Sequence, residues 1–154
     1  MGSQAGLEFK KAIEKKRIVR FTKAKALVDK ELQAAQDDLS EAEDRNKNQK
    51  YKYATIMAYY SMFHAARALI YSKGYREKSH YYLFIALKYL FTESGLLKEE
   101  LVEDFYSAMM LREGADYHGE FSPEGAHSSI ESASRFLQQT KTIFKNTRPK
   151  PKTT

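Results

Sequence analysis

An arginine and a histidine near the end of a predicted helix are the residues of this chain best suited to chemistry. Arg112 and His118 lie in the run LREGADYHGEF, with five residues between them. A guanidinium can donate two parallel hydrogen bonds to a phosphate. An imidazole, with an ordinary pKa near ~6.5, can take up or release a proton at neutral pH. The pair therefore predicts metal-independent RNA cleavage, with Arg112 as the phosphate clamp and His118 as general base or general acid.

The same residues also have an ordinary structural interpretation. Cations favour the C-terminal end of a helix, so Arg112 could be a helix-end charge or could pair with Glu113 or Asp116. His118 would then be a solvated loop residue. In the functional interpretation, Asp116 and Tyr117 would shape the turn or hold the two catalytic groups. The spacing alone does not decide between these interpretations.

A second polar pair, His64 and Arg67, lies one helical turn apart on the line of Tyr60 and Phe63. A polar group on such an apolar line must be hydrogen-bonded or must face a cleft. One interpretation is a histidine satisfied within the core, and the other is a supporting role for both residues at a polar pocket.

The motifs of metal and cofactor chemistry are missing from the sequence. Its histidines, none of which pairs with another four residues away, are His64, His80, His118 and His127. We find no HExxH, no glycine-rich phosphate loop and no GxSxG motif. The absence of cysteine excludes disulfides, thiolate zinc sites and a cysteine nucleophile. We therefore expect no metal and no cofactor.

The composition predicts one helical domain. The chain has 154 residues, 42% of them hydrophobic, with only 7 Gly and 3 Pro, and it is rich in helix formers. A net charge of +6, gathered in residues 10–25 and 145–152, permits binding to a polyanion. No apolar run approaches the ~18 residues of a membrane span, and a signal peptide is not recognisable. We expect a cytoplasmic protein that does not enter a membrane.

Helical periodicity predicts an all-α, antiparallel bundle of four to five helices. We expect a flexible start over residues 1–6, a single domain over 7–146 and a disordered basic tail over 147–154. No stretch alternates as a strand would. Gly74 and Gly114 are predicted helix ends, and Ser79 and Ser122-Pro123 are predicted helix starts. The expected helices span 7–43 (whole, or broken near 18–22), 50–72, 80–92, 98–113 and 123–145.

Eleven tyrosines are many for this length, and not all of them can be buried. A tyrosine side chain has an apolar ring and a polar hydroxyl, and such side chains suit a dimer interface or the stacking of bases. Ordinary use in the core and on the surface is the competing explanation.

Two segments together carry a family resemblance. The first is AYYSMFHAARALI, residues 58–70, followed by Gly74 and by KSH at 78–80. The second is LREGADYH, residues 111–118, followed by a predicted helix that contains Ala133 and Phe136. In this order they resemble the HEPN proteins (higher eukaryotes and prokaryotes nucleotide-binding domain), in particular a small stand-alone prokaryotic group with an R-x-x-ADY turn. The resemblance covers about residues 20 to 145.

This resemblance implies a helical bundle that dimerises and sets two Arg–His pairs in a shared cleft. Many members are metal-independent endoribonucleases, often toxins whose antitoxin is a small nucleotidyltransferase-like protein. Arg112 and His118 match the family's motif of an Arg, four to six residues and a His. Glu113 departs from it, since Asn, Asp or His is more usual there. A carboxylate at that place could neutralise Arg112.

The sequence thus leaves three functions to compare. The leading one is RNA cleavage by a homodimer. The alternative is a non-catalytic module that binds a nucleotidyltransferase-like partner or a nucleotide. General nucleic-acid binding through the basic N-terminal residues is a third.

Overall fold

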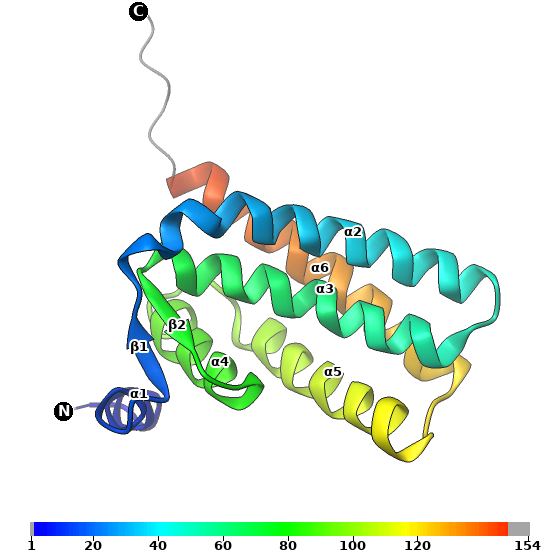
Figure 1. Cartoon of the computed structure of the whole chain (residues 1–154), viewed down its shortest axis with the longest axis horizontal. Coiled ribbons are helices and arrows are strands. Elements are labelled where there is room, and N and C mark those ends of the chain that lie inside the picture. The colour runs from blue at the N-terminus through cyan, green and yellow to red at the C-terminus, as the bar shows by residue number, and fades with distance from the viewer. Residues whose placement is uncertain (1, 148–154) are drawn as a thin grey trace, which may run out of the picture.

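Four long helices lie side by side, each antiparallel to the next along the chain (Figure 1). The computed structural model describes residues 2–147. Within that range the elements are α1 (Gln4–Glu14), β1 (Ile18–Arg20), the 3₁₀ helix η1 (Thr22–Leu27), α2 (Val28–Lys47), α3 (Tyr51–Ser72), β2 (Tyr75–Glu77), α4 (His80–Leu87), the π-helix η2 (Lys88–Thr92), α5 (Glu99–His118) and α6 (Pro123–Thr147). The predicted all-α antiparallel bundle is confirmed, with α2, α3, α5 and α6 as its long members.

Helix α3 is the centre of the bundle and packs against α2, α5 and α6. Small residues on several of its sides allow this close approach, since Ala58, Ala65 and Ala66 are all fully buried. The Ser61 hydroxyl donates a hydrogen bond of 2.7 Å to the backbone carbonyl of Ala35, which ties α3 to α2. Because α3 is held on so many sides, polar side chains that leave it have well-defined positions.

The predicted helix over residues 7–43 is broken near residues 18–22, which was one of the two alternatives. Ile18 is fully buried and belongs to β1, which pairs antiparallel with β2 in the register Ile18↔Glu77. The backbone N–H of Phe21 donates to the carbonyl of Gly74 at 2.7 Å and extends the contact. The expectation of no strand was wrong. A strand of three residues is too short to show an alternating pattern, and it forms because it pairs with a segment far away in the sequence.

Several predicted boundaries shift by a few residues. Helix α1 begins at Gln4 and not at Leu7, because the Ser3 hydroxyl accepts a hydrogen bond from the Gly6 N–H at 2.9 Å. Helix α2 continues to Lys47. Helix α6 ends at Thr147, and residues 148–154 of the expected basic tail lie outside the described residues.

Most predicted helix caps are confirmed. Ser79 caps α4, with its hydroxyl accepting from the Tyr82 N–H at 3.5 Å, and Ser122 caps α6, accepting from the Gly125 N–H at 2.9 Å. Gly74 takes the left-handed conformation just after α3, at φ +81°. These are short-range signals, so they can be recognised without the fold.

The predicted end of α5 at Gly114 was wrong. The helix passes through Gly114 and ends at His118, and Gly119 takes the left-handed conformation at φ +65°. The Glu120 N–H donates to the Gly114 carbonyl at 3.0 Å, which satisfies one of the last carbonyls of the helix. Ala115 is fully buried, and its packing offsets the ~1 kcal/mol that an internal glycine costs a helix. The connection between the two predicted helices 98–113 and 123–145 is therefore only residues 119–122.

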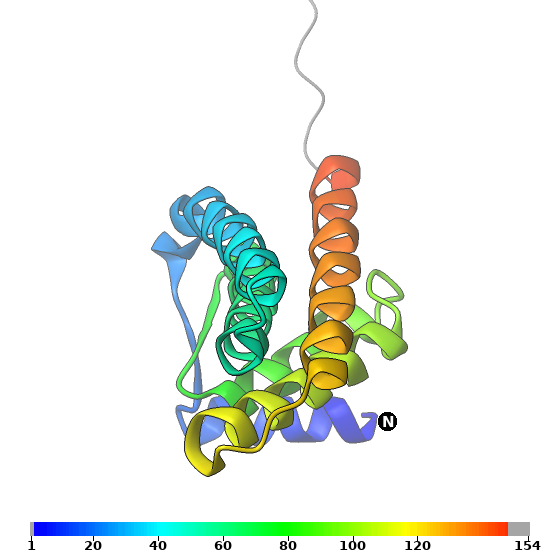
Figure 2. The ribbon, with the colours of Figure 1, turned by 90° about the vertical axis from the view of Figure 1, so that its right-hand side faces the viewer.

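The short elements lie at one end of the bundle. Helix α1 crosses beneath it and packs on α4 and η2, as the view along the bundle shows (Figure 2). Between residues 2 and 147, we find no helix with the length and apolar character needed to cross a bilayer.

Candidate functional site

Arg112 lies on the inward side of α5, one turn beyond the buried residues Ala108 and Met109. Its side chain is only 12% exposed. The guanidinium donates a hydrogen bond of 2.8 Å to the phenol oxygen of Tyr60 on α3. Its Cζ atom also lies 5.3 Å from the ring centres of both Tyr60 and Tyr117, within the range of cation–π attraction. Arg112 is therefore a cation held in an aromatic setting between two helices.

The charge of Arg112 is only weakly opposed. Its nearest carboxylate is that of Asp116, at 3.5 Å, which is longer than an ordinary N–H···O bond. Glu113 is exposed and forms no ion pair with Arg112 in the described chain. Burial lowers the pKa of Arg112, but Tyr60, Tyr117 and Asp116 outweigh burial, so the pKa is raised and the cation persists. The sequence suggested that Glu113 could neutralise the charge of Arg112. In the structure Asp116 is the carboxylate near Arg112, and at 3.5 Å it offsets that charge only weakly.

His118 is the last residue of α5 and is exposed. Six residues along an α-helix amount to about 9 Å of rise and a turn of about 120° between the two side chains. Across residues 2–147, no hydrogen bond or ion pair holds the His118 ring, and no ring packs on it. We expected Arg112 at a helix end and His118 in a loop. Both instead lie on one helix and project to different sides, so a single chain does not bring them together.

Tyr60, Tyr59 and His80 join Arg112 in one cluster that the sequence analysis did not identify. The Tyr59 hydroxyl and His80 Nδ1 are 2.5 Å apart. The His80 ring lies 4.7 Å from the ring of Phe63 and 6.3 Å from that of Tyr60. Burial, and then Arg112 and Arg67, lower the pKa of His80, so its ring is neutral at pH 7. The available signals were the KSH segment and the aromatic line of α3, but their meeting depends on how α4 packs.

The structure separates His64 from this cluster. Its Nδ1 lies 2.6 Å from a carboxylate oxygen of Glu31, and its Nε2 lies 3.5 Å from Asp38, both on α2. Burial raises the pKa of Asp38, an effect that His64 opposes. His64 thus fits the interpretation of a satisfied histidine that links α2 to α3.

Arg67 has a different partner again, the carboxylate of Glu77 on β2, at 2.6 Å. The Glu77 side chain is 2% exposed, and one of its oxygens has no partner among the described residues. Burial lowers the pKa of Arg67, but the hydrogen bond and the charge of Glu77 outweigh burial, so the pKa is raised. This ion pair joins α3 to the strand that leads into His80.

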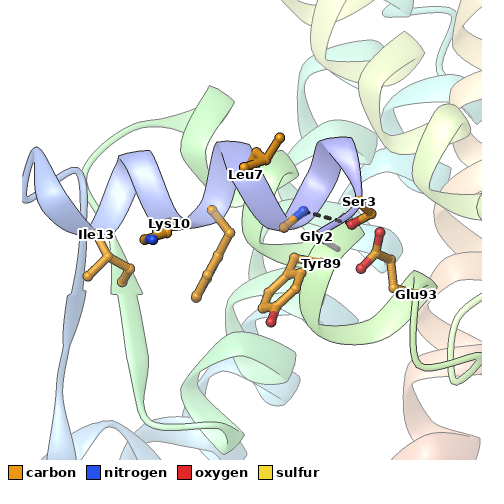
Figure 3. A pocket seen from close by; sticks show the side chains of 9 residues that line it. Gly2, Ser3, Leu7, Lys10, Ile13, Tyr89 and Glu93 are labelled. Carbon is orange, nitrogen blue, oxygen red and sulfur yellow. Dashed lines mark hydrogen bonds between the residues drawn. The ribbon is translucent and has the colours of Figure 1, made fainter.

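A separate cavity lies away from the Arg112 cluster. It has a volume of about 720 Å³ beneath α1, and residues around it include Leu7, Ile13, Tyr89 and Glu93 (Figure 3). No residue of the Arg112 cluster lines it. Within residues 2–147, acidic and histidine side chains do not gather in any group of three or more that could hold a metal ion.

Four exposed side chains and one half-buried phenylalanine form an aromatic and apolar surface beside the Arg112 cluster. Tyr81 and Phe84 on α4 have ring centres 6.4 Å apart, and Phe84 lies 5.0 Å from Tyr106 on α5. Met110 and Tyr117, which are 42% and 67% exposed, continue the line along α5. We call these five residues the α4–α5 aromatic face. It agrees with the expected surplus of tyrosine at the surface.

Comparisons with known proteins identify the family. The sequence matches the model of the HEPN domain over residues 28–144. It is 32% identical over 115 residues to "Putative toxin MJ0605" of Methanocaldococcus jannaschii, a match that covers 74% of this chain and 86% of the relative. It is 29% identical over 116 residues to "Putative toxin MJ0142" of the same organism, with 74% and 79% covered. The residues matched by the family model include α2 to α5, most of α6 and the whole Arg112 cluster. The chain therefore belongs to the HEPN domain family.

Proposed function

We propose that this protein is a metal-independent endoribonuclease that acts as a homodimer and is the toxin half of a toxin–antitoxin pair. The observation that carries the proposal is the Arg112 guanidinium, a persistent cation fixed by Tyr60 at the junction of α3 and α5. Membership of the HEPN family and the naming of two relatives as toxins support the same function. A nucleotidyltransferase-like protein is the antitoxin that the proposal implies.

The reaction needs one cation and one proton carrier. The 2′-hydroxyl of a ribose attacks the adjacent phosphorus, and the bond from phosphorus to the 5′-oxygen breaks. His118 takes the proton from the 2′-hydroxyl, and the departing 5′-oxygen gains a proton from the imidazolium or from water. Arg112 stabilises the negative charge that builds up on the phosphoryl oxygens. The products are a 2′,3′-cyclic phosphate and a 5′-hydroxyl.

In the proposed dimer, a second copy of the chain brings a His118 close to Arg112, which a single chain does not do. Since the two side chains project from different sides of α5, His118 of one protomer would serve the Arg112 of its partner. The α4–α5 aromatic face is suited to that association, because tyrosine, phenylalanine and methionine are enriched where proteins meet, and its tyrosines and Met110 are exposed. Met110 is at the middle of its α5 portion, between Tyr106 and Tyr117.

The test is RNA cleavage in the presence of EDTA by the wild-type protein and by the variants Arg112→Ala and His118→Ala. We expect 2′,3′-cyclic ends from the wild type only. A Met110→Glu variant should sediment as a monomer and lose cleavage as well. Equal cleavage by the wild type and both site variants would refute the assignment, because a contaminating nuclease would then explain the activity.

One observation favours the non-catalytic alternative. Arg112 is largely buried and has Asp116 nearby, as a structural arginine would. In that case the protein would be a helical module that binds a nucleotidyltransferase-like protein or a nucleotide. Wild-type protein that forms the complex with such a partner but leaves RNA intact under all conditions would favour this module.

A further inference from the structure

A second group of cations lies near His80, around a small cavity. A cavity of about 210 Å³ opens between α3 and the start of α4. The residues that line it come from α3, β2, the turn after β2 and the start of α4, namely Phe63, Arg67, Arg76, Glu77, Lys78, Ser79 and His80. A water molecule occupies about 30 Å³ in the liquid, so the cavity has room for a phosphate group with some of its water.

The charges at this cavity favour an anion. Its one carboxylate, Glu77, is buried, and one of its two oxygens is paired with Arg67. Arg76 and Lys78 are exposed on either side of Glu77, because alternate residues of a strand face opposite ways. The paired strand β1 adds two more exposed cations, Arg17 just before it and Arg20 at its end. The strand pair is thus a basic ribbon that leads to the cavity.

His80 completes the cavity as a donor. Burial raises the pKa of Tyr59, so its phenol keeps its proton and can donate to Nδ1 of His80. The pKa of His80 is lowered, and a neutral imidazole that accepts at Nδ1 carries its proton on Nε2. His80 is one of the residues that line the cavity, and it therefore supplies an uncharged N–H donor near the cations of Arg76 and Lys78.

Only one aromatic layer separates this cavity from Arg112. The Tyr60 ring lies 6.3 Å from the His80 ring and 5.3 Å from Arg112 Cζ. A chain with regularly spaced phosphates could therefore contact both places. A free mononucleotide could contact only one.

We propose that this cavity, with Arg76, Lys78 and His80 as its donors, binds a phosphate of the RNA strand next to the phosphate held by Arg112. The inference rests on the proposed ribonuclease function and names a second contact for the same substrate. It gives the basic strand pair a role, since single strands are bound by cations that follow their backbone.

Binding is measured with a 2′-O-methyl RNA oligonucleotide, which cannot be cleaved. Lys78→Gln and Arg76→Gln are compared with Lys11→Gln, a loss of one exposed charge on α1, away from the cavity. We expect several-fold weaker binding for the first two variants and wild-type binding for the third. The slope of log affinity against log salt should fall by about 0.7 for each lost contact on single-stranded RNA.

Nuclear magnetic resonance of the imidazole nitrogens provides a second readout that leaves the cavity intact. His80 should appear as the Nε2–H tautomer, and its signal should shift when the oligonucleotide is added. If inorganic phosphate or adenosine monophosphate shifts this signal while the oligonucleotide does not, the cavity binds a free phosphate compound and the RNA assignment is overturned.

The two proposals fail in different ways. Wild-type affinity for the oligonucleotide in both the Lys78 and Arg76 variants overturns the second contact, even if ordinary RNA is cleaved. Conversely, a wild-type protein that binds the oligonucleotide through Lys78 but never cleaves ordinary RNA refutes the nuclease and leaves the RNA contact in place.

Discussion

The guanidinium of Arg112 on α5 donates a 2.8 Å hydrogen bond to the phenol of Tyr60 on α3. Fifty-two residues separate the two in the sequence. This contact fixes a cation that would otherwise be a long, flexible side chain, and it also links two helices of the bundle. The same phenol therefore contributes to stability and to the proposed phosphate site.

The substitution Tyr60→Phe should lower both the stability of the fold and the activity of the proposed phosphate site. The ring stays, but a buried donor of Arg112 loses its acceptor, which costs about 1–3 kcal/mol in the free energy of unfolding. We expect RNA cleavage to fall at least tenfold, because Arg112 is no longer held. Urea unfolding and cleavage assays measure the two effects, with Tyr53→Phe, an exposed position on α3, as the matched control. An equal loss in both variants would mean that the Tyr60 contact has no special role.

Mixed dimers test whether the site is shared between protomers. Arg112→Ala and His118→Ala are each expected to be inactive alone. A dimer that contains one chain of each kind retains one intact Arg112 and one intact His118 on different protomers. We expect part of the wild-type cleavage from co-expressed, doubly tagged dimers purified for both chains. Inactive mixed dimers, with the association itself unchanged, would place both groups of a working site on the same chain.

Two glycines, one inside α5 and one just after its end, should respond to alanine in opposite directions. Gly114 lies inside the helix, and an added Cβ would meet other atoms no closer than 3.7 Å. Gly114→Ala should therefore raise the free energy of unfolding by up to about 1 kcal/mol. Gly119→Ala should lower it by about 1 kcal/mol, because φ +65° is strained for alanine. Thermal and urea unfolding measure both, and destabilisation by the first change would show that α5 ends earlier.

His80 should make stability depend on pH. Burial, with Arg112 and Arg67 nearby, lowers the pKa of His80 below its ordinary 6.5. The unfolded chain therefore binds a proton at a pH where the folded chain does not. The stabilisation is complete above pH 6.5 and is lost as the pH falls through the lowered pKa.

The variant His80→Gln should remove that part of the dependence, while His118→Gln, at an exposed position, should leave it intact. Urea unfolding is measured between pH 8 and about pH 5, a range in which most carboxyl groups stay ionised. An identical pH profile in wild type and His80→Gln would contradict the assignment.

The sequence by itself determined the helices and the family. The helices could be predicted because their signals are local. Such signals depend on residues within a few positions of one another, as in the apolar spacing of α3, the Ser79 and Ser122 caps and the turn at Gly74. The AYY and R-x-x-ADY segments gave the HEPN resemblance in the same way. Arg112 was also evident as a candidate from the sequence, because its neighbours in the chain define the motif.

Tertiary packing decided where those side chains point. The burial of Ala115 and the closure at Gly119 carry α5 past Gly114, which turns His118 away from Arg112. The approach of α4 to α3 brings His80 to Tyr59 and opens the basic cavity beside it. Short-range propensities differ by about 1 kcal/mol or less, and burial contributes more than that for a single large side chain. Contacts between distant residues therefore override local preference, and they set the geometry on which the proposed chemistry depends.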